Sequence, residues 1–227
     1  PITKRFSELS KQIFDKEKAK AIFIVNGDIM IRTLALLAGF AWFARQGAQF
    51  GDATLAANHI LLQFISMSAY FLDGFANVTE MIVGQAYGAK KRQRFVRAVI
   101  DNTVIAAVSA LMLSLILMVF GHLFIQALTP DASLQTIANQ HKSLAAFYIF
   151  VSFVAFQLDG VFVGVTNSKA MRNSTVIALF SMLITGYLLS PVLGNVGLWM
   201  ALIVFIIARG VVLTIYYPKI LSNTQWQ

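Results

Sequence analysis

The feature that most restricts the fold of this chain is a series of long apolar runs separated by short polar segments. The runs cover residues 21–44, 55–83, 98–120, 144–165, 174–190 and 196–217. Each is long enough for an α-helix to cross a bilayer, which takes about 17–25 residues. A transmembrane barrel would instead show short segments of alternating polarity. We therefore predict an all-α integral membrane protein with six transmembrane helices.

Composition supports this class and excludes others. Of the 227 residues, 58% are hydrophobic and only 12% are charged, about half the charged fraction of a soluble domain. The net charge of +8 does not indicate a nucleic-acid partner, because the basic residues lie in short segments between apolar runs. The chain has no cysteine, which excludes disulfides and thiolate metal sites. Membrane lipid is the expected surrounding.

The basic residues also predict the orientation. The first 20 residues, the second and fourth connections and the tail carry six, five, two and one Lys or Arg, whereas the opposite side carries Arg45 and Lys142. Positive charge favours the cytoplasmic side. We expect both termini of this segment to be cytoplasmic in a cell (inner) membrane. The predicted division is 1–20 as a juxtamembrane linker, 21–219 as the six-helix region and 220–227 as a cytoplasmic tail.

Several ionisable side chains lie inside the apolar runs. They are the acids Asp28, Asp73, Glu80 and Asp159 and the bases Arg32 and Arg209. Each would cost about 2.5–3.5 kcal/mol if it faced lipid, so we expect them to face protein, water or one another. The acids outnumber the bases, and an unpaired buried carboxyl binds and releases protons or coordinates a cation. Both are chemistries of ion-coupled transport.

Spacing suggests which of these groups meet. Asp28 and Arg32 are four residues apart, so they can form an ion pair on one helical face or an ion site. Asp73, Asn77 and Glu80 share one face of the second helix. They can bind ions, or brace the helix against Arg32 or the remaining arginine, Arg209. Both interpretations remain open at this point.

Small residues, caps and prolines predict packing and helix ends. Gly160 and Gly164 are four residues apart, which allows a close helix contact. Asp131 or a nearby Ser is expected to cap the fourth helix, and Pro191 and Pro218 are expected to end the last two. Asn58 lies near the start of the second run, where the membrane interface can solvate it.

Catalysis is not expected. The chain has no Ser/His/Asp arrangement, no HExxH and no strand-linked glycine-rich phosphate loop. Its three histidines lie far apart in the sequence and form no cluster with metal-ligand spacing. We predict that the protein is not an enzyme.

Four segments in order carry a resemblance to a known family. They are NGDIMIRTL (26–34), LDGFANVTEMIVGQAYGA (72–89), LDGVFVGVTNSKAMRNS (158–174) and GLWMALIVFIIARG (197–210). Together they resemble the carboxy-terminal half of a multidrug and toxic compound extrusion (MATE) transporter of the DinF-like subgroup.

This resemblance implies a fold of twelve helices in two six-helix lobes, of which this chain is the second. It implies export of drugs and other organic compounds, cationic ones in particular, in exchange for protons or sodium, with no other cofactor. The expected partners are the amino-terminal lobe of the same protein and small organic substrates. The cavity of such folds lies between the lobes, so this half alone would not complete a transport cycle.

The resemblance also ranks the site residues. In sodium-coupled relatives, a carboxylate on the seventh helix and an Asp on the tenth are cation ligands. Asp28 and Asp159 match them, so they are the leading candidates for proton coupling or for a sodium site. Ala155 stands near where some relatives have a Tyr, which weakens the case for a sodium site of that kind. The second rank holds Asp73, Asn77, Glu80, Arg32 and Arg209.

Two other functions fit a six-helix membrane half. One is a lipid or polysaccharide flippase of a related two-lobe fold, which several cationic residues in the cavity would favour. The other is a non-transporting membrane scaffold. The excess of acids within the runs favours the antiporter with cationic cargo.

Overall fold

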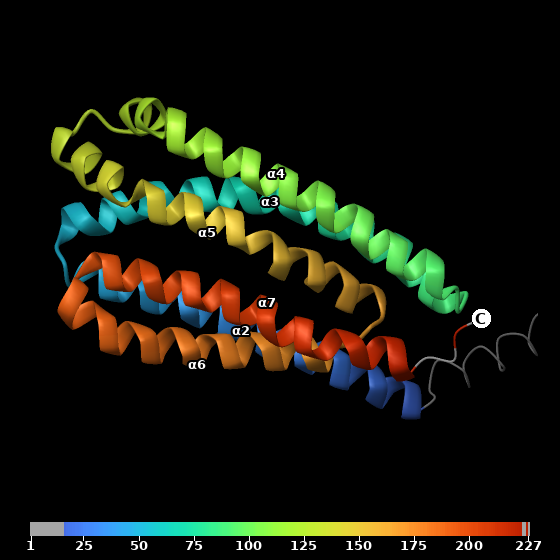
Figure 1. Cartoon of the computed structure of the whole chain (residues 1–227). Helices are drawn as coiled ribbons and strands as arrows, with labels where there is room; N and C mark the ends of the chain where they lie inside the picture. Colours follow the sequence, from blue (N-terminus) through green and yellow to red (C-terminus); the bar gives the residue numbers. More distant parts are fainter. Residues whose placement is uncertain (1–15, 224–225, 227) are drawn as a thin grey trace, which may run out of the picture.

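The structure, a computed structural model, describes residues 16–223 and 226, and its elements are six long helices (Figure 1). They are α2 (Lys16–Ala48), α3 (Asp52–Gly88), α4 (Arg92–Leu128), α5 (Ala132–Gly164), α6 (Ser168–Leu193) and α7 (Asn195–Asn223). Each is long and apolar enough to cross a membrane. The prediction of an all-α protein with six membrane helices is therefore confirmed.

The helices extend beyond the predicted spans. The expected basic loop over 84–97 is reduced to the three residues between Gly88 and Arg92, and helix replaces most of the connection between the third and fourth runs. Residues 16–20 of the predicted linker begin α2, and α7 continues through Asn223 into the predicted tail. Hydropathy marks where lipid ends, whereas a helix continues into the headgroup region. The rest of the linker lies outside the described residues.

The prolines were expected to end helices, and this is wrong for both. Pro191 lies in the last turn of α6, and Pro218 lies inside α7. Membrane helices tolerate proline because neighbouring groups satisfy the freed carbonyl. The stop after α6 is instead Gly194, whose φ of 59° favours glycine. The predicted cap at Asp131 is confirmed, since its side chain accepts a 2.8 Å hydrogen bond from the Ser133 amide.

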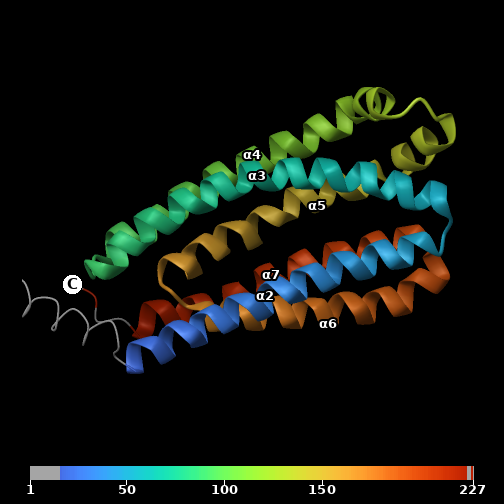
Figure 2. The same cartoon turned by 180° about the vertical axis from the view of Figure 1, so that it is seen from behind.

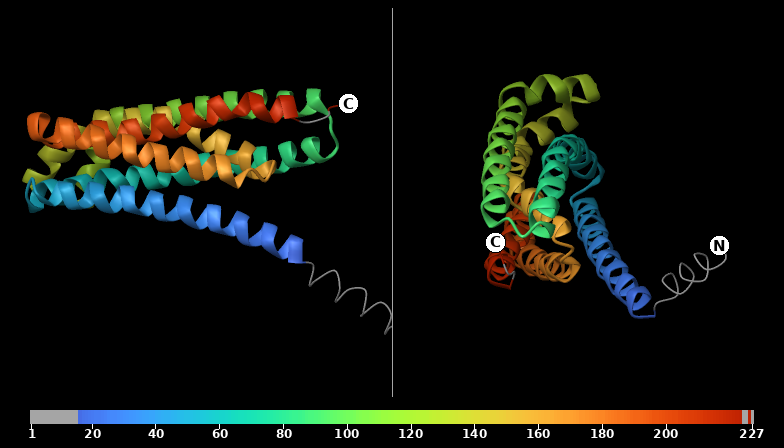
Figure 3. Two further views of the ribbon diagram at one scale, coloured as in Figure 1. Left: turned by 90° about the horizontal axis from the view of Figure 1, so that it is seen from below. Right: turned by 90° about the vertical axis from the view of Figure 1, so that its right-hand side faces the viewer.

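The helices form two groups of three. Helices α3, α4 and α5 pack together on one side and α2, α6 and α7 on the other, with α5 against α7 as the main contact between the groups (Figures 1 and 2). At the end of the bundle where α2 begins, α2 leans away from the other helices (Figure 3). The start of α2 and the end of α7 lie at this same end.

Two apolar cores occupy the two ends of the bundle. One contains Phe43, Ala155, Trp199 and Phe205 among its buried side chains. The other contains Val161 and Leu213, with aromatic and aliphatic side chains from α3, α4 and α6. Along α5 and α7, the residues between these cores include Asp159 and Arg209. The charged residues therefore lie where the two cores meet.

The closest helix contact joins α3 to α5. An added Cβ on Gly160 would lie 2.9 Å from the carbonyl carbon of Ala76, and one on Gly164 would lie 2.7 Å from the backbone oxygen of Glu80. Only glycine permits this approach, so the predicted close packing through the glycine pair is confirmed. The contact holds Asp159, next to Gly160, close to the polar face of α3.

Candidate functional site

A cleft of about 420 Å³ lies between α2 and α3, with α5 and α7 at its base. Four ionisable side chains line it, namely Arg32, Asp73, Asp159 and Arg209, together with aromatic residues that include Phe40, Tyr70, Tyr148 and Phe156. The first four come from four different helices. The structure therefore brings together one residue of the first rank and three of the second.

Asp159 binds two arginines through one oxygen. The Nη2 group of Arg32 donates a hydrogen bond of 2.5 Å to Asp159 Oδ2, and Nη2 of Arg209 donates to the same oxygen. The side chains of Arg32, Asp159 and Arg209 are 21%, 12% and 6% exposed. The guanidinium of Arg209 also lies 6.0 Å from the ring centre of Phe205, a favourable cation–π position. Two positive charges thus converge on one carboxylate.

Asp28 lies outside this cleft and has other partners. Its Oδ1 accepts a 2.5 Å hydrogen bond from Arg172 Nη1, and its Oδ2 accepts one of 3.0 Å from the Ser168 hydroxyl. The predicted pair between Asp28 and Arg32 is therefore wrong. The spacing allowed it, but both side chains find partners on other helices. Sequence reasoning missed Arg172, which it placed in a loop, although it lies in the first turns of α6.

The five charges alternate in sign across the lobe. In order, they are Arg209, Asp159, Arg32, Asp28 and Arg172, carried by α7, α5, α2, α2 and α6. We call this set the ion-pair row, and its net charge is +1. Charges in a low-dielectric interior must be compensated, and this row compensates all but one. It also ties α2, few of whose apolar residues are buried, to both halves of the bundle.

Asp73 differs from the other acids of the cleft. It is exposed to the cleft and, among the described residues, it has no hydrogen bond and no ion pair. Asp159, Arg32 and Arg209 are near enough to influence its charge. The prediction that Asp73 braces the helix against an arginine is wrong, because both arginines bind Asp159.

The rest of the polar face of α3 does not join the cluster. Asn77 is exposed and Glu80 is half-buried, and neither lines the cleft. Neither side chain pairs with an arginine within the described part of the chain. The predicted shared face of α3 is therefore divided, with Asp73 alone at the cleft.

A sodium site that uses Asp28 and Asp159 together gains no support from this arrangement. Each carboxylate already binds arginine, and the two have different partners. Residues 16–223 contain no group of three acidic or histidine side chains suited to a metal ion. A cation at either carboxylate would have to compete with a guanidinium.

A buried amide cluster joins α3 to α7 near the other end. Asn58 is 2% exposed and exchanges hydrogen bonds of 2.7 and 2.9 Å with Asn195, while the indole N–H of Trp199 donates to Asn58 at 2.9 Å. The expectation that Asn58 is solvated at the interface is therefore wrong. Three polar groups far apart in the sequence satisfy one another instead.

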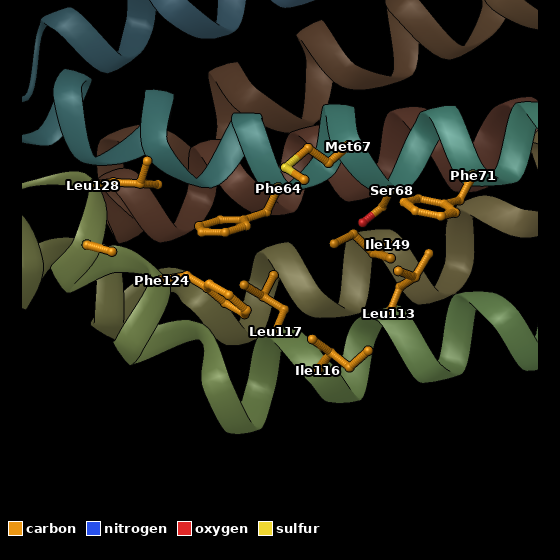
Figure 4. A pocket seen from close by; sticks show the side chains of 11 residues that line it. Phe64, Met67, Ser68, Phe71, Leu113, Ile116, Leu117, Phe124, Leu128 and Ile149 are labelled. Carbon is orange, nitrogen blue, oxygen red and sulfur yellow. The ribbon is translucent and has the colours of Figure 1, made fainter.

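A second cavity is apolar. It measures about 320 Å³ and lies between α3, α4 and α5, lined by side chains such as Phe64, Phe71, Leu113 and Phe124, with the Ser68 hydroxyl directed into it (Figure 4). None of its lining residues is charged. It can accommodate an apolar group, but it offers no group that binds an ion.

Six membrane helices around a drug-sized cleft with buried charges define this chain as one lobe of a membrane transporter. A model of the MatE family matches residues 31–192, and the chain belongs to that family of multidrug and toxic compound extrusion transporters. Its members are transporters rather than enzymes. The resemblance found in the sequence is thereby confirmed.

Individual relatives agree with this assignment. The chain is 32% identical over 207 residues to DNA damage-inducible protein F of Escherichia coli, covering 91% of this chain and 45% of that protein. It is 27% identical over 179 residues to the probable multidrug resistance protein YoeA of Bacillus subtilis, covering 74% of this chain and 37% of YoeA. The chain thus spans about half the length of these relatives or less.

Solved structures show the same fold. A mutant of the Vibrio cholerae MATE transporter VcmN superposes with a TM-score of 0.85 at 18% identity, covering 95% of this chain and 50% of VcmN. A Pyrococcus furiosus transporter of the MOP superfamily, described as having a binding pocket of reverse polarity, superposes with a TM-score of 0.79 at 12% identity, covering 92% and 46%. The six helices therefore match one lobe of a two-lobe transporter.

Proposed function

We propose that this chain is the second lobe of an antiporter in the inner membrane that exports small organic compounds, cationic ones in particular, in exchange for protons or sodium. The observation that carries the proposal is the pairing pattern in the cleft. Asp159 is held by two arginines, and Asp73 opens to the same space without one. The first lobe of the same protein would close the other side of the cleft.

The chemistry of exchange follows from these two carboxylates. Asp73 can bind either a proton or an organic cation, and the two compete because each neutralises the same charge. Proton uptake at Asp159 would weaken its bonds to Arg32 and Arg209, which join three helices. Such a change biases the packing of α2 against α5 and α7, as alternating access requires. Asp28 provides a second coupling candidate, with Arg172 as the group released.

The basic residues support the proposed orientation. The short connections after α3 and α5 lie at the same end as the start of α2 and the end of α7 (Figure 1). Lys90, Lys91 and Lys169 flank these connections, and Arg172 lies one turn further into α6. Under the positive-inside rule this end is cytoplasmic.

The test uses the full-length protein, with both lobes, reconstituted in lipid vesicles. Efflux of a cationic dye is measured under a pH gradient and, separately, under a sodium gradient. Asp73→Asn and Asp159→Asn are expected to lower gradient-driven efflux by tenfold or more, on the order of what loss of an essential proton-transfer group costs. Asp101→Asn, at an exposed ion pair with Arg97, is the matched control. Undiminished efflux in both cleft variants would contradict coupling at this site and favour a scaffold.

One observation favours the flippase as a second candidate. Two arginines line the cleft, and guanidinium groups bind phosphate well. Movement of a fluorescent anionic phospholipid between leaflets, measured in the same vesicles, separates the two functions. Lipid movement that is lost in Arg32→Gln, without dye efflux under either gradient, would establish the flippase.

A further inference from the structure

We propose that the cleft selects cargo that carries a carboxylate as well as a positive group, with Arg32 binding the carboxylate and Asp73 the positive group. This inference rests on the proposed function, because it names the substrate class of the same cleft. It goes beyond an organic cation by adding an acidic group. The evidence lies in the exposure of Arg32, in the unpaired atoms around Asp159 and in the charge balance of the cleft.

Arg32 is the arginine that a ligand can reach. Its side chain is 21% exposed, whereas that of Arg209 is 6% exposed and lies over the ring of Phe205. Arg32 uses Nη2 for Asp159, and a guanidinium carries five N–H donors in a planar fork. Arg32 therefore has donors to spare at the cleft while it remains bound to Asp159.

The cluster is incompletely paired. Arg32 Nε, Arg209 Nε and Asp159 Oδ1 are buried and have no hydrogen-bond partner among the described residues. Both arginines crowd onto Asp159 Oδ2 and leave Oδ1 free. Buried polar atoms are normally paired. A carboxylate arriving at Arg32 would supply acceptors to this donor-rich side, as carboxylates commonly do for arginine.

The charge balance points to a ligand with both signs. Arg32 and Arg209 against Asp159 leave one positive charge, and Asp73 supplies one negative charge from the facing helix. A purely cationic ligand would meet Asp73 but leave the excess guanidinium charge unmatched. A purely anionic ligand would leave Asp73 unmatched. A zwitterion matches both walls at once, which makes its desolvation least costly.

The remaining walls define the body of this cargo. Phe40, Tyr70 and Phe156 line the cleft with Arg32 and Asp73. The volume of about 420 Å³ lies within the range of about 300–1,000 Å³ for sites that take drug-sized molecules. The expected cargo is an aromatic zwitterion rather than an inorganic ion.

The test compares two dyes that differ by one group. One is a rhodamine with a free benzoate, and the other is its methyl ester, which is purely cationic. Binding to the full-length protein in lipid nanodiscs is measured by fluorescence polarisation, without any gradient. The wild-type protein is expected to bind the free acid about tenfold more tightly or better, the effect of one charge-assisted hydrogen bond.

Variants assign the preference to its residues. Arg32→Gln is expected to bring the ratio of the two Kd values to about one, while Arg32→Lys keeps part of the preference because it keeps the charge. Asp73→Asn should weaken both dyes by a similar factor, since both carry the same cation. Arg45→Gln removes an arginine outside the cleft and should retain the wild-type ratio.

The outcomes are distinguishable. An equal affinity of the wild-type protein for both dyes would overturn the inference, and this measurement needs no variant to fold. A preference that survives in Arg32→Gln, or disappears equally in Arg45→Gln, would also overturn it. If the preference follows Arg32 but neither gradient drives efflux, the cargo assignment stands and the antiport proposal fails. If gradients drive efflux of both dyes without preference, the reverse holds.

Discussion

The contact between α3 and α5 predicts a large effect for one added methyl group. In Gly160→Ala the new Cβ would lie 2.9 Å from the carbonyl carbon and 3.0 Å from the Cα of Ala76, where ordinary carbon contacts are about 3.5–4.0 Å. The neighbours are backbone atoms, so no side-chain rotation relieves the overlap. The helices must separate by roughly 0.5–1 Å, at an overpacking cost of about 1–3 kcal/mol.

The opposing term is small. Alanine is favoured over glycine within a helix by about 0.5–1 kcal/mol, so the net loss for Gly160→Ala is about 0.5–2 kcal/mol. Gly74→Ala is the matched control, because it lies in α3 and an added Cβ there meets no atom within 4 Å. It receives only the favourable term and is expected to be as stable as the wild type or slightly more stable.

Thermal unfolding of the full-length protein in detergent, followed by size-exclusion fluorescence, measures the difference. At about 2–4 °C per kcal/mol for a unit of this size, Gly160→Ala should lower Tm by roughly 1–8 °C relative to the wild type and by more relative to Gly74→Ala. Dye efflux should fall as well, because Asp73 moves relative to Asp159. A Gly160→Ala variant as stable as Gly74→Ala would refute the close contact.

Three further predictions follow from polar contacts. Asn58→Ala should cost about 1–3 kcal/mol of stability, because it leaves a buried amide and an indole N–H unpaired, and Tm shows this against an exposed Asn77→Ala control. Asp28→Asn and Arg172→Gln should each destabilise more than their combination would predict, with a coupling of about 1–3 kcal/mol in a double-mutant cycle; strict additivity would contradict the buried pair. Hydrogen bonding from Ser133 lowers the pKa of the Asp131 carboxyl from its ordinary value of 3.8. Its contribution is therefore complete above that value and lost as the pH falls through the lowered pKa, so Asp131→Asn should flatten the acid end of the Tm profile.

The helices themselves could be predicted because their cause is local. Apolar runs of membrane length specify helices, and the Gly160 and Gly164 spacing specifies a close contact on one face. The ends could not be placed, because charged residues such as those from Arg92 onward leave the lipid without leaving the helix. Hydropathy is a statement about solvent and not about backbone conformation.

The site was only partly predictable, because its contacts are not local. Spacing suggested that Arg32 pairs with Asp28, four residues away, yet Arg32 pairs with Asp159 at a separation of 127 residues. Arg172 meets Asp28 across 144 residues. The apparent excess of acids disappears once Arg172 is included, and the argument for a purely cationic cargo weakens with it. Such pairings depend on helix packing, which a single sequence does not state.

The ion-pair row has a consequence for how the protein is made. Helix α2 is synthesised well before its partners on α5, α6 and α7, since those contacts span 127 and 144 residues. Until then, Asp28 and Arg32 would each face lipid at an insertion cost of about 2.5–3.5 kcal/mol. Their spacing of four residues allows them to neutralise each other during this interval. The pair suggested by spacing, though absent from the folded lobe, therefore suits the newly inserted helix, and partner exchange would accompany completion of the bundle.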